Sequence, residues 1–206
     1  MLDTRNAILD ATDRLLAHYG YQKMTVEDIA REAGIGKRTI YLHFPSKEEI
    51  ALATADRNIE RMVELLKAEA SGPGSASVRL KGLLMTRVEY MLDRAKEYQP
   101  AFENLLANLR PAYMLRRERY VEMEAKVIAQ VICAGQREGS LAEDDAMVSA
   151  RLLILATNAM LPFSLSAHAL QNREAILERT ERMANLLLDG LRSRPDETTN
   201  MKGNQP

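Results

Sequence analysis

The nine residues from Gly36 to Phe44 (GKRTIYLHF) gather side chains whose chemistry suits contact with a polyanion. A guanidinium group can pair with the edge of guanine, while ammonium and hydroxyl groups hold backbone phosphates. The stretch supplies two cations and three hydrogen-bonding side chains: Lys37, Arg38, Thr39, Tyr41 and His43. No acidic residue lies between Ala33 and Lys47, although residues 1–60 carry eight basic and ten acidic side chains. The signal for DNA binding is therefore local, and net charge adds nothing to it.

Two short helices around a tight turn would position these side chains. Thr25 precedes an apolar-periodic segment and has Asp28 three residues later, which predicts a capped helix from about Val26 to Ala33. Gly34 lies where the chain must leave that helix through a left-handed conformation. A second helix is expected from about Gly36 to His43. This arrangement is a helix-turn-helix, whose second helix enters the major groove.

The second helix should have one buried and one exposed face. We expect Ile40 and Phe44 to be buried and the side chains of Lys37, Arg38 and Tyr41 to point outward. Pro45 ends the helix. Ser46, with Glu49 three residues later, predicts a capping box for the next helix.

At these residues the chain resembles the tetracycline-repressor (TetR) family of bacterial transcription regulators. The resemblance covers the first 50 to 60 residues and includes AILDATDRLLAHYGYQKM, TVEDIAREAG, GKRTIYLHF and PSKEEI. It implies that Arg38 is placed to read a base, and that six other residues contact DNA, mostly its phosphates: Thr25, Lys37, Thr39, Tyr41, His43 and Lys47. Leu42 departs from the pattern, because many members have an aromatic residue at that position. A thymine methyl group is then its only base target.

Each of these residues has an alternative role. Lys37 and Arg38 are also what a solvated helix start can carry, Tyr41 is also compatible with a core position, and His43 with a hydrogen-bonding role below Phe44. Thr25 is a helix cap in either case. Lys47 is expected to be an exposed cation at the start of the following helix.

The remaining chain predicts an all-α protein of about nine helices. Glycine and proline separate six further segments of helical length. These are expected at 47–70, 77–98, 101–109, 112–134, 143–170 and 172–193. We expect a DNA-binding domain at residues 1–48, a helical effector-binding and dimerisation domain at 49–193, and a disordered tail at 194–206.

The last two long helices are expected to form a homodimer. The final one repeats apolar or small residues at spacings of three and four, which makes a stripe that needs a partner: Ile176, Thr180, Met183, Ala184, Leu187, Leu188 and Leu191. Packing within the same chain is the alternative. A two-fold dimer would present two recognition helices to a palindromic operator.

The resemblance further implies a repressor that a small apolar or amphipathic effector releases from DNA. The alternatives are a DNA-binding regulator without a small-molecule effector, either controlled by a protein partner or acting as an activator, and after it a helical enzyme or scaffold. Ten residues of the middle helices could line the effector pocket, although core packing is the more common role for each: Met85, Tyr90, Met91, Phe102, Leu106, Tyr113, Met114, Met160, Phe163 and His168. Pro162 predicts a kink near Asn158 in an apolar helix, where a freed carbonyl could meet a ligand.

Composition limits the other classes of function. The single cysteine, Cys133, lies in an apolar patch and is expected to be buried, and the chain shows no secretory segment, so we expect a cytoplasmic protein. The uncharged stretch 152–170 is long enough to consider as a membrane span, but its polar residues and Pro162 argue against one. The scattered histidines and the absence of a phosphate-binding loop predict no metal site, no cofactor and no enzyme.

Overall fold

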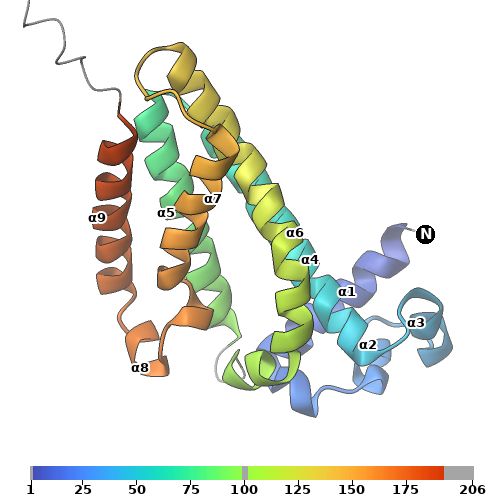
Figure 1. Ribbon diagram of the computed structural model, residues 1–206. Coiled ribbons are helices and arrows are strands. Elements are labelled where there is room, and N and C mark those ends of the chain that lie inside the picture. The colour runs from blue at the N-terminus through green and yellow to red at the C-terminus, as the bar shows by residue number, and fades with distance from the viewer. Residues whose placement is uncertain (1, 99–101, 193–206) are drawn as a thin grey trace, which may run out of the picture.

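The computed structural model describes residues 2–98 and 102–192, and the regular elements of these residues are all helices (Figure 1). Within these residues nine α-helices and two short 3₁₀ turns follow one another, so the all-α prediction is confirmed. The tail predicted at 194–206 lies outside the described residues.

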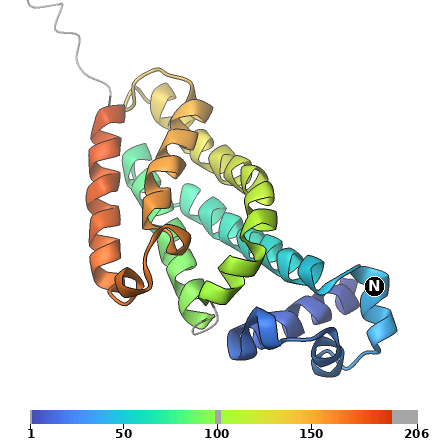
Figure 2. The same ribbon diagram turned by 60° about the horizontal axis from the view of Figure 1, so that its bottom comes forward.

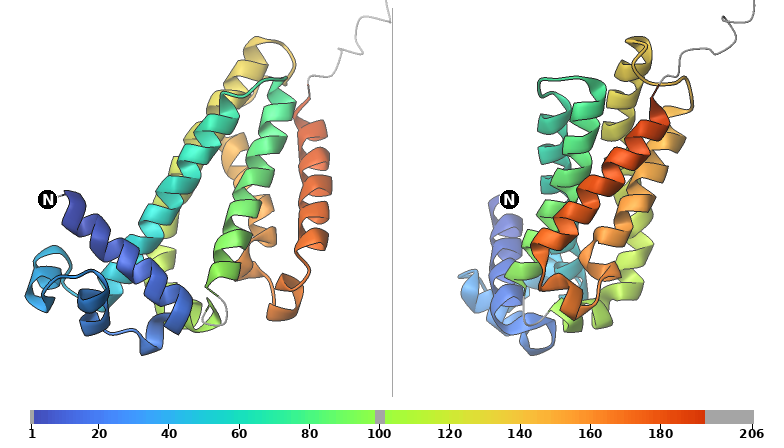
Figure 3. Two further views of the ribbon diagram at one scale, coloured as in Figure 1. Left: turned by 180° about the vertical axis from the view of Figure 1, so that it is seen from behind. Right: turned by 90° about the vertical axis from the view of Figure 1, so that its left-hand side faces the viewer.

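The first three helices form one end of the molecule (Figure 3). They are α1 (Leu2–Lys23), α2 (Val26–Glu32) and α3 (Lys37–His43). Gly20 interrupts the last part of α1 with a φ of 74°, a conformation open mainly to glycine. The core beneath these helices includes Ile8, Ile29 and Ile40, each fully buried.

Helix α4 (Lys47–Ala70) has the bounds that the sequence predicts. Its start is fixed by Ser46, whose hydroxyl accepts a hydrogen bond from the backbone N–H of Glu49 at 3.1 Å. The capping box is one-sided, because the Glu49 carboxylate accepts hydrogen bonds from Arg116 instead. The same residue that was expected to cap α4 therefore joins it to a helix far along the chain.

Helices α5 (Ala76–Glu97) and α6 (Phe102–Arg137) follow, and α6 differs from the prediction. Two helices broken at Pro111 were expected, whereas one helix of 36 residues contains this proline. Figure 2 shows that α6 changes direction in its first part. A proline inside a helix removes one backbone donor and kinks the helix without necessarily ending it.

The single helix predicted at 143–170 is wrong. Helix α7 (Ala146–Thr157) ends early, 3₁₀ turns follow at Asn158–Met160 and Pro162–Ser164, and α8 (Ala167–Leu170) has four residues. The predicted kink near Asn158 is thus a complete end of the helix. Leu161 is extended, with φ −83° and ψ 151°, the conformation that a following proline favours.

Helix α9 (Arg173–Leu191) packs alongside α5 (Figure 1). Four members of its predicted stripe, Ile176, Thr180, Ala184 and Leu188, are buried within the same chain. The stripe therefore packs in part within its own chain, which is compatible with a dimer, and the dimer stays a prediction. The exposed apolar residue of α9 is Leu186, with 76% of its surface exposed.

Three further observations concern single features. Cys133 is exposed, so the buried thiol expected from its apolar neighbours is wrong. No helix in residues 2–98 or 102–192 is long and apolar enough to cross a membrane. Within the same residues, no group of three or more His, Cys, Asp or Glu side chains is arranged to hold a metal ion.

Candidate functional site

The turn between α2 and α3 is built as the sequence predicts. The Thr25 hydroxyl accepts from the Asp28 N–H at 3.1 Å, and the Thr25 N–H donates to the Asp28 carboxylate at 3.0 Å. Gly34 has a φ of 68°, and the N–H of Ile35 returns to the carbonyl of Ala30 at 3.0 Å. These bonds fix where α3 begins relative to α2.

Helix α3 lies at the edge of the molecule with one face exposed (Figure 1). Ile40 is fully buried and Phe44 is 4% exposed, so they anchor the helix. Lys37 and Arg38 are exposed, as are the side chains of Tyr41 (47%) and Leu42 (78%). The predicted division into an anchored and an open face is confirmed.

The five polar residues of α3 are not equivalent. Arg38 has no hydrogen-bond or ion-pair partner among the described residues, and it is exposed at the start of the helix. Thr39 and His43 are half-buried, one turn apart. Tyr41 lies near Lys37, whose ammonium nitrogen is 5.9 Å from the centre of the tyrosine ring. The exposed face of α3 therefore begins with the guanidinium group of Arg38, which is available to bind DNA.

Lys37 is paired with an acid of the preceding helix. Its ammonium group donates to the carboxylate of Glu27 on α2. This hydrogen bond lowers the pKa of Glu27 and raises that of Lys37. A phosphate that binds Lys37 can use one of its other N–H donors, but it competes with the Glu27 carboxylate for the positive charge of the ammonium group.

Lys47 is not the exposed cation that the sequence suggested. Its half-buried ammonium group donates to the carbonyl oxygens of Tyr21 at 3.0 Å and of Met24 at 3.1 Å. It also lies 4.4 Å from the centre of the Tyr21 ring. Lys47 thereby ties the end of α1 to the start of α4.

Arg5 is a cation near α3 that sequence reasoning missed. Its guanidinium carbon lies 5.0 Å from the centre of the Phe44 ring, and the residue is exposed. Arg5 stands 32 residues before the first residue of α3, outside the helix-turn-helix motif, so its spacing gives no signal. Only the fold brings α1 close to Phe44 at the end of α3.

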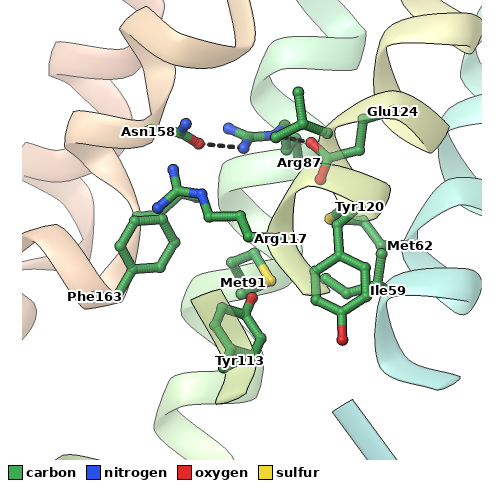
Figure 4. A pocket seen from close by; sticks show the side chains of 12 residues that line it. Ile59, Met62, Arg87, Met91, Tyr113, Arg117, Tyr120, Glu124, Asn158 and Phe163 are labelled. Carbon is green, nitrogen blue, oxygen red and sulfur yellow. Dashed lines mark hydrogen bonds and ion pairs between the residues drawn. The ribbon is translucent and has the colours of Figure 1, made fainter. Parts of the chain in front are cut away.

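The larger part of the molecule contains a small, partly enclosed cavity between α4, α5, α6 and the turn after α7 (Figure 4). Its volume is about 20 Å³, which is room for about one water molecule. Aliphatic and aromatic side chains form most of the wall: Ile59, Met62, Met91, Tyr113, Tyr120, Val121, Leu161 and Phe163. Two arginines, one glutamate and one asparagine complete it: Arg87, Arg117, Glu124 and Asn158.

A buried polar network forms one side of this cavity. Arg87 of α5, 3% exposed, donates to the carboxylate of Glu124, to the hydroxyl of Thr157 at 3.2 Å, and to the side-chain oxygen of Asn158. Figure 4 shows Glu124 and Asn158 on two sides of the guanidinium group. Arg117 lies above the ring of Phe163, 4.4 Å from its centre. The cavity therefore combines an apolar wall with a fixed charged wall.

The predicted pocket residues fall in several places. Tyr113, Phe163 and Met91 line the cavity. Met85 lies instead at a surface depression beside α9, Met114 is 43% exposed, and His168 is exposed on α8. These three residues do not line this cavity, and their role in ligand binding stays a prediction. Tyr90 and Met160 pack against neighbouring parts of the core without lining the cavity. The side chains of Phe102 and Leu106 lie outside the described residues.

The four polar residues of the cavity were missed, although part of the signal was present. Arg87 follows Leu80 and Leu84 on the apolar stripe of α5, and Glu124 follows Tyr120 on that of α6. A charge in a core register is rarely buried unless it has a partner. The core position of Arg87 and that of Glu124 each indicated a buried charge with a partner, but the sequence did not show that the two residues pair with each other.

Several hydrogen bonds join the cavity region to the end of the molecule that bears α3, and two of them are made by tyrosine hydroxyl groups. Tyr120, in the cavity wall, donates its hydroxyl to Asp56 of α4, which also binds Arg116 and Arg119. On the other side, Tyr98 at the end of α5 donates to Asp13 of α1.

Tyr98 is also part of the core beneath α1, α2 and α3. Burial, and after it the charge of Asp13, raises the pKa of the Tyr98 hydroxyl well above its ordinary value. This phenol therefore stays protonated and keeps donating its hydrogen bond to Asp13.

An apolar row is exposed on α7. Val148, Leu152 and Leu155 are 47%, 58% and 66% exposed and recur at spacings of four and three residues, which places them on one face. Leu186 is exposed on α9, which packs against α7. These four residues form what we term the α7/α9 apolar row.

Comparison with known proteins points to one family. The family model described as bacterial regulatory proteins, tetR family, matches residues 8–54. A fatty acid metabolism regulator protein of Bacillus subtilis is 38% identical over 68 residues, covering 31% of this chain and 35% of the relative. FasR, a transcriptional activator of Mycolicibacterium smegmatis, is 26% identical over 102 residues, covering 50% of this chain and 47% of the relative. The matched regions span about a third to a half of these relatives.

Solved structures extend the likeness to the whole fold. A regulator from Saccharomonospora viridis, solved with choline, superposes with a TM-score of 0.64 at 24% identity, covering 94% of this chain and all of that one. FadR from Bacillus subtilis, solved with stearoyl-CoA, superposes with a TM-score of 0.65 at 17% identity, covering 90% of this chain and 98% of that one. At such identities the likeness concerns the fold. Residues 8–54 of this chain therefore match the tetR family of bacterial regulatory proteins, and the described residues share the fold of these solved regulators.

Proposed function

We propose that the chain is a DNA-binding transcriptional regulator: a homodimeric repressor that a small molecule releases from a palindromic operator. The observation that carries DNA binding is the exposed face of α3, where Arg38 stands without a partner among the described residues beside Lys37 and Tyr41. A helix with such a face suits the major groove.

The contacts divide into one base reader and several phosphate binders. Arg38 is the base reader. Four residues of α3 bind DNA phosphates: Lys37, Thr39, Tyr41 and His43. Thr25, at the N-terminus of α2, binds a phosphate of the same DNA strand. Lys47 has three N–H donors, two of which serve carbonyl oxygens, and the third is left for phosphate. We assign this role to residues 1–48, and effector binding and dimerisation to 49–193.

Salt dependence tests the DNA-binding proposal. Binding of the full chain to duplex DNA should weaken steeply as salt rises, because each phosphate contact releases a counterion. Fluorescence anisotropy with a labelled duplex from the regulator's own upstream region measures it. A binding constant that does not change with salt would exclude this use of α3.

The α7/α9 apolar row supports a homodimer. Burying these four large apolar residues against a second copy removes them from water. In such a dimer we expect the centres of the two α3 helices to lie roughly 34 to 40 Å apart, about one turn of DNA. Leu152→Glu should give monomers in size-exclusion chromatography with light scattering. Leu115→Glu is the matched control, since Leu115 is 86% exposed on α6 and outside the row. Equal behaviour of the two variants would place the interface elsewhere.

The cavity supports release by an effector. The related structures solved with choline and stearoyl-CoA have the same fold, and here the cavity wall is bonded through Tyr120 to α4, which begins beside α3. An effector that favours one dimer shape would shift the population away from the DNA-binding one. Since about 20 Å³ holds one water, the wall must open for entry. The test is whether any small molecule that binds the chain lowers operator affinity.

A further inference from the structure

Leu42 is an apolar side chain that the fold does not use. It is 78% exposed, more than any other large apolar residue in the described part of α1, α2 and α3. It also belongs to none of the hydrophobic clusters of the described residues, whereas its neighbours Ile40 and Phe44 hold α3 in the core. A single exposed leucine is ordinary on a protein surface. This one lies on the helix whose exposed face is proposed to bind DNA.

Leu42 points directly away from the buried side of α3. Successive residues of an α-helix are turned by about 100° around its axis. Ile40 is fully buried, and Phe44 lies about 40° from it. Leu42 lies about 200° from Ile40 in the same direction, and Arg38 lies about 160° from it. Arg38 and Leu42 are four residues apart, so they are neighbours on the outermost side of the helix, and we term them the outer pair.

The polar residues of α3 lie on either side of the outer pair. Lys37 and Tyr41 are about 60° and 100° from Ile40 in one direction, and Thr39 and His43 are about 100° and 60° from it in the other. The 5.9 Å between the Lys37 ammonium nitrogen and the Tyr41 ring centre agrees with a shared side. A helix in the major groove has base edges in front of it and phosphates beside it. The outer pair therefore faces the base edges.

The group on a base edge that suits Leu42 is the methyl group of thymine. In the major groove the four bases present hydrogen-bond donors, hydrogen-bond acceptors and one apolar group, the C5 methyl of thymine. A leucine side chain leaves a donor or acceptor without a partner, which costs free energy, whereas it gains from covering a methyl group. Residues 34–46 contain exposed Lys37 and Arg38 and no acid, which favours DNA over an apolar protein surface as the partner.

We propose that Leu42 is a specificity-determining residue, which contacts a thymine methyl group close to the guanine that Arg38 reads. This deepens the proposed function, since it rests on α3 binding in the major groove. Four residues of helix advance about 6 Å, which equals about two base-pair steps of about 3.4 Å. With the long side chain of Arg38, the thymine lies within about three base pairs of the guanine. Each half of the operator should contain both bases at this spacing.

The full chain first selects its own site from a library of randomised duplexes. Arg38→Ala identifies the guanine, because this variant relaxes the preference at that position. Each thymine within about three base pairs of it, in one half of the site, is then replaced by deoxyuridine. Uracil keeps the pairing and the hydrogen-bonding groups of thymine and lacks only the methyl group. Fluorescence anisotropy should show that one of these replacements lowers the affinity about three- to fivefold, the effect of one methyl group removed from water.

Leu42→Ala shows whether the leucine causes this preference. The variant should bind the thymine and uracil duplexes with less than about a twofold difference, because the partner of the methyl group is gone. Leu115→Ala is the matched control, since Leu115 is 86% exposed on α6 and its loss should keep the wild-type ratio. Alanine is a good helix former at both exposed positions, and circular dichroism checks the fold. A wild-type ratio in folded Leu42→Ala contradicts the role of Leu42.

The remaining outcomes separate Leu42 from DNA binding itself. A chain that selects no sequence and binds no duplex loses the regulator function, and the role of Leu42 with it. A chain that selects a site but binds every uracil duplex as tightly as the thymine duplex keeps the function and loses only the role of Leu42. A site at which Arg38→Ala relaxes no guanine also overturns the proposal, because the outer pair then does not face the base edges.

Discussion

Tyr120 donates its hydroxyl to Asp56 of α4, while the same residue lines the cavity. Tyr113 also lines the cavity, and the centre of its ring lies 5.5 Å from that of Tyr120. The hydroxyl of Tyr113 has no hydrogen-bond partner among the described residues. The two tyrosines thus share an environment and differ in one bond. That pair isolates the contribution of the bond between α6 and α4.

Tyr120→Phe should lower the free energy of unfolding by roughly 1 kcal/mol, because a buried hydrogen bond is lost while Asp56 keeps Arg116 and Arg119. Tyr113→Phe should be close to neutral. Urea unfolding followed by circular dichroism measures both. If the two variants lose the same stability, the bond to Asp56 does not stabilise the junction.

Glu27→Gln should strengthen DNA binding. It frees Lys37 from its carboxylate, so phosphate no longer competes for the ammonium group. We expect a gain of roughly two- to fivefold at low salt that fades as salt rises. Glu32→Gln on the same helix removes the same charge but frees Arg14 instead. A gain of the same size in both variants would mean that net charge, and not Lys37, is responsible.

Lys37→Ala and Arg38→Ala should weaken DNA binding in different ways. Loss of Lys37 should reduce affinity for all sequences and lower the salt slope by about one. Loss of Arg38 should cost about 1 to 3 kcal/mol and relax preference at one base position. A library of operator variants read by sequencing measures both effects. Unchanged preference in the Arg38 variant would remove its role as a base reader.

Alkaline pH should destabilise the folded chain through Tyr113. Burial, with Glu124 nearby, raises the pKa of Tyr113 from 10.0 to about 12. The folded state therefore holds this proton more tightly, so the stabilisation is complete below the unfolded pKa of 10.0 and is lost as pH rises through about 12.

In Tyr113→Phe, the free energy of unfolding should therefore fall less steeply between pH 10.0 and about 12 than in the wild type. The difference in slope should correspond to about one bound proton. Unfolding free energies from urea titrations at several alkaline pH values measure the slope. Tyr19→Phe, which removes an exposed hydroxyl, is the control. Identical slopes in wild type and Tyr113→Phe would contradict the raised pKa.

Local signals predicted the helix-turn-helix because its structure depends on local bonds. Thr25 caps with Asp28, Gly34 turns in the left-handed region, and Ser46 begins α4, all within a few residues. Lys47 was misjudged for the opposite reason. Its partners, the carbonyl oxygens of Tyr21 and Met24, become available only when α1 packs against α4.

The cavity could not be predicted because its polar wall joins three distant segments. Arg87, Glu124 and Asn158 meet across α5, α6 and the turn after α7, and composition does not show which buried charge finds which partner. The end of α7 was foreseeable in part, since the residue before Pro162 disfavours helix. Pro111 shows the limit of that rule, because α6 continues through it.

The place of Tyr98 bears on the design of chimeric regulators. A graft of residues 1–48 onto a foreign effector domain would carry Asp13 without the phenol that binds it, and would leave a gap in the core of the grafted part. The first residue beyond the graft, Glu49, pairs with Arg116, and this bond across the junction would be lost as well. A working transplant should therefore bring the end of α5 along, or introduce a tyrosine at the equivalent place in the recipient.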